Sequence, residues 1–262
     1  LLIATGSRAA LPSIPGLAEA AASGFALTNR EILSLGERPG RLLILGGGVI
    51  GLEMAAYFRA AGTETTVVEA LPQIATGPDP ELAALLRRDM EKRGIRFLTN
   101  AKCVAVSQGG IDVELSAGTR EALAGDKLLV AVGRRPNADG IGLETIGLEL
   151  DARGAIPTDD RMRTAVEGVY AAGDVDGTSM LAHTAFREAE VAVANIAGED
   201  ARMSYAAVPS VIYTHPEAAS VGETLASATD KGISAREIKL SMRHSGRYLV
   251  ENEGGAGVMK LI

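Results

Sequence analysis

The clearest pattern of apolar and polar positions lies between residues 41 and 98, where short apolar runs alternate with stretches of helical periodicity. The runs predict strands at 41–45, 65–68 and 95–98, and the periodic stretches predict helices at 49–61 and 79–93. Gly62 and Gly94 follow the two helices, as expected for helix C-caps. The order β-α-β-α-β is that of a mononucleotide-binding half of a doubly wound parallel sheet.

On either side of this region the pattern predicts shorter pieces. Residues 102–132 change to a period of two, which favours a meander of strands covering one face of the sheet. Further strands are expected at 1–5, 167–172, 211–213, 236–240 and 258–262, with a helix at 183–197. Thr28 and Glu31 have the spacing of a helix start. We therefore expect an α/β fold in which the β-α-β unit lies inside a longer framework of strands.

A glycine motif stands between the first strand and the first helix of that unit. Gly46 would permit the tight turn, Gly48 would let a pyrophosphate approach the backbone, and Gly51 would let helix and strand pack closely. Glu69 ends the next strand, 18 residues after Gly51, where a carboxylate can accept hydrogen bonds from adenosine ribose hydroxyls. The alternative is a glycine turn with a structural role only. The full context favours a dinucleotide site.

Glu69 also bears on which dinucleotide binds. A 2′-phosphate at about 4 Å from this carboxylate would be repelled by roughly 4 kcal/mol per charge pair at an effective dielectric near 20. NADP sites place an arginine there instead, and residues 70–75 contain none. The sequence therefore predicts NAD.

Composition narrows the possible partners. The formal net charge of -7 disfavours nucleic acid and anionic membranes, and no apolar run is long enough to span a bilayer. Cys103 is the only cysteine, so an internal disulfide and a multi-cysteine metal site are excluded, and a reducing cytoplasm is favoured. No metal site is expected. The chain begins and ends within strand-like runs, from which we expect a fragment of a longer protein.

Six stretches together carry a resemblance to a known family. They are residues 43–53, 67–74, 131–137, 171–175, 180–183 and 209–217. In this order they make the chain similar to the flavin-dependent pyridine nucleotide–disulfide oxidoreductases, and most of all to the dihydrolipoamide dehydrogenases among them.

The resemblance implies contacts with NAD. Those residues are Gly46, Gly47, Gly48, Val49, Ile50, Gly51, Leu52, Glu53, Glu69, Cys103 and Gly133. Val49 replaces a gating tyrosine of glutathione reductase. Glu53 matches a glutamate that pairs with a lysine on the flavin side, although on the residues alone it is equally a solvated helix position. Cys103 would contact adenine through its backbone, with an inert thiol.

The resemblance also implies contacts with FAD. Those residues are Thr5, Gly6, Ser7, Asp174, Met180, Leu181, Ala182 and His183. Asp174 would bind the ribityl chain, and the stretch from Met180 to His183 would lie at the flavin edge. Isolated histidines more often have structural or capping roles, so no catalytic residue is assigned to the chain, His183, His215 and His244 included.

The resemblance further implies a division of the chain. We expect a Rossmann-like NAD domain at 38–136, inserted in a partial FAD domain at 1–37 and 137–207, and the start of an α+β interface domain at 208–262. The family's first GxGxxG and its CxxxxC would precede residue 1, and its His–Glu pair would follow residue 262, so the chain is expected to be catalytically incomplete.

The parent enzyme would oxidise dihydrolipoamide with NAD⁺ through a redox disulfide and FAD, as a cytoplasmic homodimer associated with a 2-oxoacid dehydrogenase complex. Two alternatives stay open. The first is another member of the family, of the mercuric reductase, glutathione reductase or NADH oxidase type. The second is a stand-alone NAD-binding module without redox activity.

Overall fold

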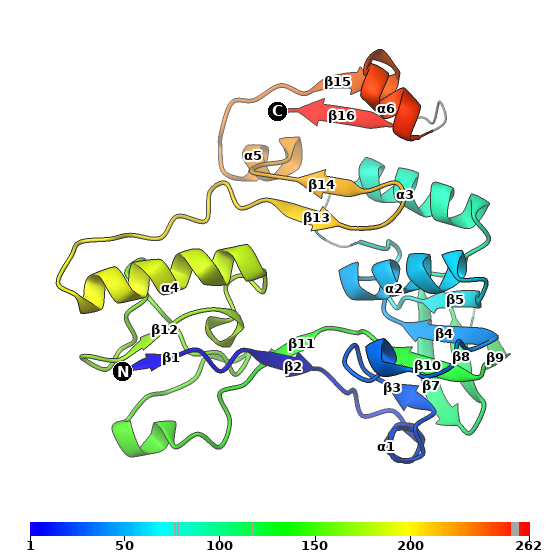
Figure 1. The fold of residues 1–262 in the computed structure, drawn as a ribbon, viewed down its shortest axis with the longest axis horizontal. Helices are drawn as coiled ribbons and strands as arrows, with labels where there is room; N and C mark the ends of the chain where they lie inside the picture. The colour runs from blue at the N-terminus through cyan, green and yellow to red at the C-terminus, as the bar shows by residue number, and fades with distance from the viewer. Residues whose placement is uncertain (76, 78, 117, 253–256) are drawn as a thin grey trace.

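A five-stranded parallel sheet forms the centre of one unit of the computed structural model, which describes residues 1–75, 77, 79–116, 118–252 and 257–262 (Figure 1). Its order is β3-β10-β4-β5-β6. These strands are β3 (Ala26–Leu27), β4 (Arg41–Leu45), β5 (Glu64–Val68), β6 (Arg96–Leu98) and β10 (Lys127–Val130). Helices α2 (Val49–Ala60) and α3 (Pro80–Lys92) connect β4 to β5 and β5 to β6. The strand order reverses at β4, because β10 lies on the side of β4 opposite to β5.

The central strand β4 is apolar throughout because both of its faces are covered. Leu42 and Ile44 pack toward α2 and α3, whereas Leu43 and Leu45 pack toward a meander on the other face. The meander consists of β7 (Ala101–Ser107), β8 (Gly110–Leu115) and β9 (Arg120–Ala124), with α1 (Leu17–Ala22) packed beside it. Helices, parallel sheet and meander therefore make three layers. The short 3-10 helix η1 (Ile32–Ser34) precedes β4.

A second unit combines the start of the chain with residues 134–203 (left in Figure 1). Its elements are β1 (Leu2–Ile3), β2 (Ser7–Ala9), β11 (Arg134–Pro136), η2 (Leu143–Ile146), β12 (Tyr170–Ala171), η3 (Asp174–Asp176) and α4 (Ala182–Ile196). β1 pairs with β12 in parallel, and β2 pairs with β11 in antiparallel orientation. These pairings bring residues far apart in the sequence into one unit with its own apolar cluster around Ile156 and Val175.

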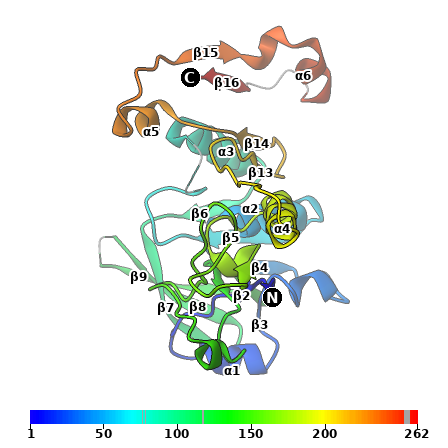
Figure 2. The same cartoon turned by 90° about the vertical axis from the view of Figure 1, so that its left-hand side faces the viewer.

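The last part of the chain forms two hairpins, which lie above the helices of the parallel sheet in Figures 1 and 2. Its elements are β13 (Ser210–Ile212), β14 (Ala218–Ser220), α5 (Leu225–Asp230), β15 (Ile238–Ser241), η4 (Met242–His244), α6 (Gly246–Glu251) and β16 (Val258–Leu261). Ile212 is buried in the apolar cluster between the sheet and α2 and α3. The first hairpin is thereby fixed on this helical layer.

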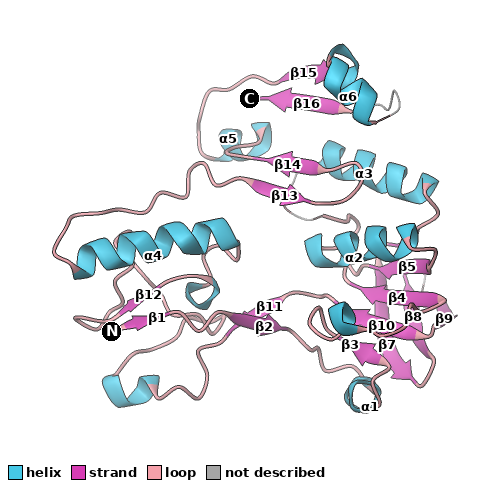
Figure 3. Ribbon diagram, in the orientation of Figure 1, coloured by secondary structure: helices cyan, strands magenta, loops and turns pink. Residues whose placement is uncertain are grey.

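The observed elements differ from the expected ones in several places, three of which concern the parallel sheet and the meander (Figure 3). Residues 127–130 were expected in the meander, but they form β10, which inserts between β3 and β4 of the parallel sheet. The third meander strand is instead β9, which the sequence pattern missed. The parallel sheet also includes β3, so it begins earlier in the chain than residue 38, the expected start of the NAD domain. The division into domains stays a proposal.

Candidate functional site: a glycine turn and a polar cluster

The glycine turn lies between β4 and α2, where the strand order of the sheet reverses. Gly46 has φ +102°, and a Cβ there would lie 2.3 Å from the carbonyl oxygen of Ala131 at the end of β10. A Cβ on Gly51 would lie 2.1 Å from the carbonyl oxygen of Gly46. Both positions therefore require glycine, because strand, turn and helix meet too closely for a side chain.

Gly48 differs from these two glycines. It is the N-cap of α2 with an extended backbone (φ −78°), and a Cβ built on it meets no atom within 4 Å. No side chain in the described part of the chain caps α2, so amide groups of its first turn are left for another partner. The helix macrodipole adds a partial positive charge at this point. An open face, free amides and positive potential are the features that bind a phosphate.

Glu69 follows β5 and reaches back to the glycine turn. Its Oε2 accepts a hydrogen bond from the backbone amide of Gly47 at 2.7 Å, and its Oε1 accepts one from that of Leu71 at 2.8 Å. Each carboxylate oxygen can accept a second hydrogen bond. The spacing of Glu69 and Gly51 in the sequence therefore does place a carboxylate beside the glycine turn, partly buried and fixed at both oxygens.

The remaining residues with an implied NAD contact occupy different settings. Val49 and Gly133 are exposed, Gly133 with φ +129° and open space around a built Cβ. Leu52 is fully buried and packs α2 on the sheet, and Ile50 is partly exposed. Glu53 is neither free in solvent nor paired with a lysine in the described residues: its Oε1 accepts a hydrogen bond from the backbone amide of Tyr213 at 2.9 Å. Glu53 thus ties α2 to the end of β13.

Cys103 lies on β7, two residues beyond Ala101, whose amide donates to the carbonyl oxygen of Glu69 at 3.0 Å. Its side chain is buried with Leu45 and Val68 in the cluster beneath the sheet. Burial raises the pKa of the Cys103 thiol to about 11. The thiol is therefore protonated and shielded at neutral pH, as expected for an inert cysteine.

A polar cluster joins the residues with an implied FAD contact. The Ser7 hydroxyl donates to Oδ2 of Asp174, and the Thr5 hydroxyl donates to the carbonyl oxygen of Asn137 at 2.6 Å. Asn137 in turn donates its backbone amide to Gly6 at 2.8 Å and its side-chain amide to Thr5 at 3.1 Å. The turn at residues 5–7 and the start of η3 are thus neighbours although they lie far apart in the sequence.

Arg134 also belongs to this cluster, although no role was expected for it. Its Nε donates to the Ser7 hydroxyl at 2.6 Å and lies 3.7 Å from Oδ2 of Asp174. Residues 131–137 are one of the six stretches that carry the family resemblance, and within them only Gly133 has an expected contact. Its antiparallel pairing with Ser7–Ala9 is a long-range contact, which no local pattern indicates. The signal available in the sequence was the pair of arginines directly after Gly133.

The stretch from Met180 to His183 leads into α4. Leu181 is the N-cap residue, Met180 is partly exposed, and Ala182 and His183 are exposed. The Nε2 of His183 lies 2.9 Å from the carbonyl oxygen of Pro209 and must donate its proton to it. This contact agrees with the expectation of a structural histidine. Gly173 is further linked to α4 by Glu188, another residue without a predicted role.

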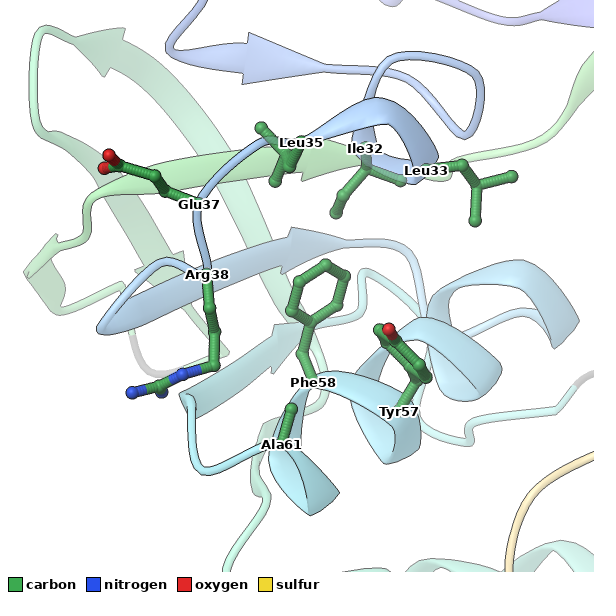
Figure 4. A pocket seen from close by; sticks show the side chains of 8 residues that line it. All are labelled: Ile32, Leu33, Leu35, Glu37, Arg38, Tyr57, Phe58 and Ala61. Carbon is green, nitrogen blue, oxygen red and sulfur yellow. The ribbon is translucent and has the colours of Figure 1, made fainter.

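A cavity of about 180 Å³ lies apart from both groups of residues (Figure 4). It is lined from η1 and the C-terminal half of α2, with Leu33, Tyr57 and Phe58 among its residues. None of the predicted site residues contributes to it. In the described ranges, no helix combines the length and apolar character needed to cross a bilayer.

The fold and the glycine turn define a dinucleotide-binding α/β protein, and comparison with known proteins refines this class. The family described as pyridine nucleotide-disulphide oxidoreductase matches residues 1–189, and its dimerisation domain matches residues 208–262. The chain therefore belongs to the pyridine nucleotide-disulphide oxidoreductase family. This membership implies the use of a pyridine nucleotide and a flavin, and it confirms the family expected from the sequence.

Individual relatives agree with this family. The dihydrolipoyl dehydrogenase of Thermus scotoductus is 43% identical over 229 residues, which are 86% of this chain and 49% of that protein. The dihydrolipoyl dehydrogenase of Chlamydia muridarum is 38% identical over 99% of this chain and 56% of its own length. The chain thus spans about half the length of the curated relatives it matches.

Solved structures give the same result. The HOCl-induced flavoprotein disulfide reductase RclA of Escherichia coli superposes with a TM-score of 0.87 at 28% identity, over 99% of this chain and 59% of its own. LpdA of Mycobacterium tuberculosis superposes with a TM-score of 0.85 at 29% identity, over 99% of this chain and 56% of its own. Both similarities extend across the three units described above.

Proposed function

We propose that this chain binds NAD(H) at the glycine turn, as part of an enzyme that oxidises dihydrolipoamide with NAD⁺ through FAD and a redox disulfide. One observation carries the proposal: Gly48 presents an open, amide-rich helix start, and Glu69 is fixed beside it by the amide of Gly47. A pyrophosphate at α2 and a ribose at Glu69 would occupy the two ends of one adenosine diphosphate. The similarity to dihydrolipoyl dehydrogenases supports the substrate class.

The chemistry of the chain's own residues would be binding and orientation. The amides at the start of α2 would donate hydrogen bonds to the pyrophosphate, and the Glu69 oxygens would accept hydrogen bonds from the ribose hydroxyls. Glu69 would also disfavour a 2′-phosphate by like-charge repulsion. When bound, the flavin would relay electrons between a thiol pair and the nicotinamide. Gly133, which lies beside β10 with an open face, would let the nicotinamide half approach the backbone.

We assign the flavin contacts to the polar cluster. Asp174 and Ser7 offer a carboxylate and a hydroxyl, and Arg134 neutralises the carboxylate from 3.7 Å. These groups suit a chain of hydroxyls such as the ribityl part of a flavin. Met180, Leu181, Ala182 and His183 would line the flavin edge at the start of α4.

We also propose finer assignments, which the family supports. The match of residues 208–262 to a dimerisation domain supports a homodimer, and the relatives' names support association with a 2-oxoacid dehydrogenase complex. A single buried and reduced cysteine is compatible with the cytoplasm. The observed pairing of Glu53 with the amide of Tyr213 supports a role for the first hairpin in positioning α2.

Two glycine substitutions test the site. Gly48→Ala adds a methyl group where nothing stands within 4 Å, so the fold should be kept while the pyrophosphate is obstructed. We expect NADH affinity to fall by about tenfold or more, which is about 1.4 kcal/mol in binding free energy. Gly51→Ala places its methyl 2.1 Å from the Gly46 carbonyl oxygen and should instead lower stability, by about 1–3 kcal/mol.

Calorimetric titration with NADH and thermal unfolding separate the two effects. Unaltered NADH affinity in a folded Gly48→Ala variant would show that the pyrophosphate does not lie against this glycine, and the proposed site would have to be abandoned.

A further inference from the structure

Glu188 is a carboxylate buried completely within the second unit. It lies on α4, and its side chain is 0% exposed. Oε2 accepts a hydrogen bond from the backbone amide of Gly173 at 2.6 Å, and Oε1 accepts one from the Tyr205 hydroxyl at 2.9 Å. Burying a carboxylate is unfavourable. We therefore look for the role of Glu188 in the hydrogen bonds that it accepts, which an apolar side chain could not form.

The surroundings of Glu188 make its charge still less favourable. Burial raises the pKa of Glu188, and the neighbouring carboxylates of Asp176 and Asp174 raise it further, whereas the bond from Gly173 opposes the rise. Asp176 is 3% exposed, and its Oδ2 has no hydrogen-bond partner in the described part of the chain. Core stability alone therefore gives no reason for a third acid at this point.

The bond to Gly173 shows what Glu188 fixes. Gly173 has φ +77°, which favours glycine, and it immediately precedes Asp174 at the start of η3. Asp174 then directs its carboxylate to the Ser7 hydroxyl and toward Arg134. The amide of Gly173 is thus held by Glu188 of α4, while the carboxylate of the next residue, Asp174, faces the polar cluster.

We propose that Glu188 is a positioning residue, whose bond to the Gly173 amide fixes the turn that presents Asp174 to the hydroxyl chain of a flavin. This inference rests on the proposed flavin contacts of the polar cluster. Glu188 itself would not touch the flavin, because its side chain is completely buried. Its effect would reach the side chain of Asp174 through the backbone amide of Gly173.

The test uses the ¹⁵N-labelled 262-residue chain and three variants. Glu188→Met fills the same space but cannot accept the bond. Glu188→Gln keeps an acceptor for Gly173, with its amide group facing the Tyr205 oxygen. Glu190→Gln removes a charge from an exposed position of the same helix and is the matched control. The rate of hydrogen exchange at the Gly173 amide measures how firmly the turn is held. Chemical-shift changes of Ser7 and Asp174 on adding FAD measure FAD binding.

We expect Glu188→Met to speed the exchange of Gly173 by about ten- to a hundredfold, because the hydrogen bond that protects its amide is lost. FAD binding read at Asp174 should weaken by about tenfold or more in the same variant. Glu188→Gln should rescue both quantities to within about threefold, and Glu190→Gln should change neither. Rescue by the glutamine distinguishes positioning by a hydrogen bond from a requirement for bulk or charge.

Several results would overturn the inference. Fast exchange of Gly173 in the unchanged chain would remove its basis even if Glu188→Met does not fold. Equal FAD responses in the unchanged chain and Glu188→Met, or no response at Ser7 and Asp174 in either, would show that the turn is not held for a flavin. NADH binding, measured in the same samples, tests the nucleotide site separately, so a failure there is distinguishable from a failure here.

Discussion

At the scale of single residues, the burial of Cys103 decides its chemistry. The thiol lies beneath the parallel sheet, hydrogen-bonded at 3.4 Å to the carbonyl oxygen of Ala105, and burial raises its pKa to about 11. At pH 8 only roughly one thiol in a thousand is then ionised, and the thiolate is the reactive form. Cys103 would therefore take no part in a thiol–disulfide relay.

We predict that Cys103 in the folded chain reacts with a thiol reagent at pH 8 more than about a hundredfold more slowly than in the unfolded chain. A chromogenic disulfide reagent, with and without guanidinium, measures both rates. Because the thiol pKa is raised, the rate in the folded chain should still increase between pH 8 and pH 10. Rapid modification of the native chain at pH 8 would contradict the inert role.

The sequence predicted the relative positions of residues well where those positions depend on local spacing. Gly46, Gly51 and Glu69 belong to one β-α-β unit, so their separation along the chain fixes their separation in space. Arg134 and Glu188 escaped prediction because their partners, Ser7 and Gly173, are brought to them by tertiary packing. The two alternatives for Glu53 also omitted its observed partner, the amide of Tyr213, for the same reason.

At the scale of elements, an ion-pair cluster connects the second hairpin of the C-terminal unit to the start of α3. Lys260 on β16 lies within 3.2 Å of carboxylate oxygens of Asp79, Glu81 and Glu237. Lys239 on β15 also pairs with Glu81. Asp79 is the N-cap of α3, so the cluster acts on the helix that follows the Glu69 loop.

We predict that Lys260→Met lowers the Tm at pH 7, because three carboxylates then face one another without this cation. Burial raises the pKa of Asp79, but the hydrogen bond from Lys260 outweighs it and holds this pKa below its usual value. The pKa of Glu81 is likewise lowered, by Lys239 and then by Lys260. Stability from a lowered carboxylate pKa is present above the unfolded value and is lost as pH falls through the folded one. The Tm difference between variant and unchanged chain should therefore shrink below pH 4.

Thermal unfolding monitored by circular dichroism between pH 3 and pH 7 measures this dependence. Lys231→Met is the matched control, because Lys231 pairs with Glu223 within the C-terminal unit. An equal Tm loss at pH 3 and pH 7, or an equal loss in the control, would show that the cluster does not hold the hairpin to α3.

Elements with long periodic patterns were predictable, and short ones were not. The strands and helices between Arg41 and Leu98 were expected within a residue or two of their observed limits. The strands β9 and β14 were missed, because five and three residues carry little periodicity. Strand β10 was recognised as a strand but placed in the meander, since alternation along a strand does not say which sheet it joins.

At the scale of the whole molecule, the two proposed ligand regions differ in how much of the surrounding structure supports them. The glycine turn and Glu69 lie in one continuous three-layer unit with buried cores on both faces of the sheet. The polar cluster joins residues 5–7 to residues 134–174, and the strand pairings beside it are only two and three residues long. The one GxGxxG in these 262 residues is the turn from Gly46 to Gly51.

We therefore predict that the purified 262-residue chain retains little flavin, because it binds added FAD only weakly, although it binds NADH. The polar cluster offers contacts to a ribityl chain, but these residues contain no second glycine turn for the pyrophosphate of FAD. Visible absorption spectra after gel filtration measure the flavin content. A yellow preparation with one flavin per chain would contradict the expectation and would indicate a phosphate site elsewhere in these residues.

Selectivity for NADH over NADPH tests the central claim, that Glu69 binds the adenosine ribose, most directly. Calorimetric titrations should show NADH binding at least about tenfold more tightly than NADPH, because the Glu69 carboxylate repels a 2′-phosphate. Glu69→Gln should narrow this preference for NADH, and Glu69→Arg should abolish or reverse it. Glu64→Arg is the control, because it makes the same charge change at the exposed opposite end of β5 and should leave the preference intact. Equal or tighter binding of NADPH by the unchanged chain, or the same selectivity in Glu69→Arg and Glu64→Arg, would contradict the account.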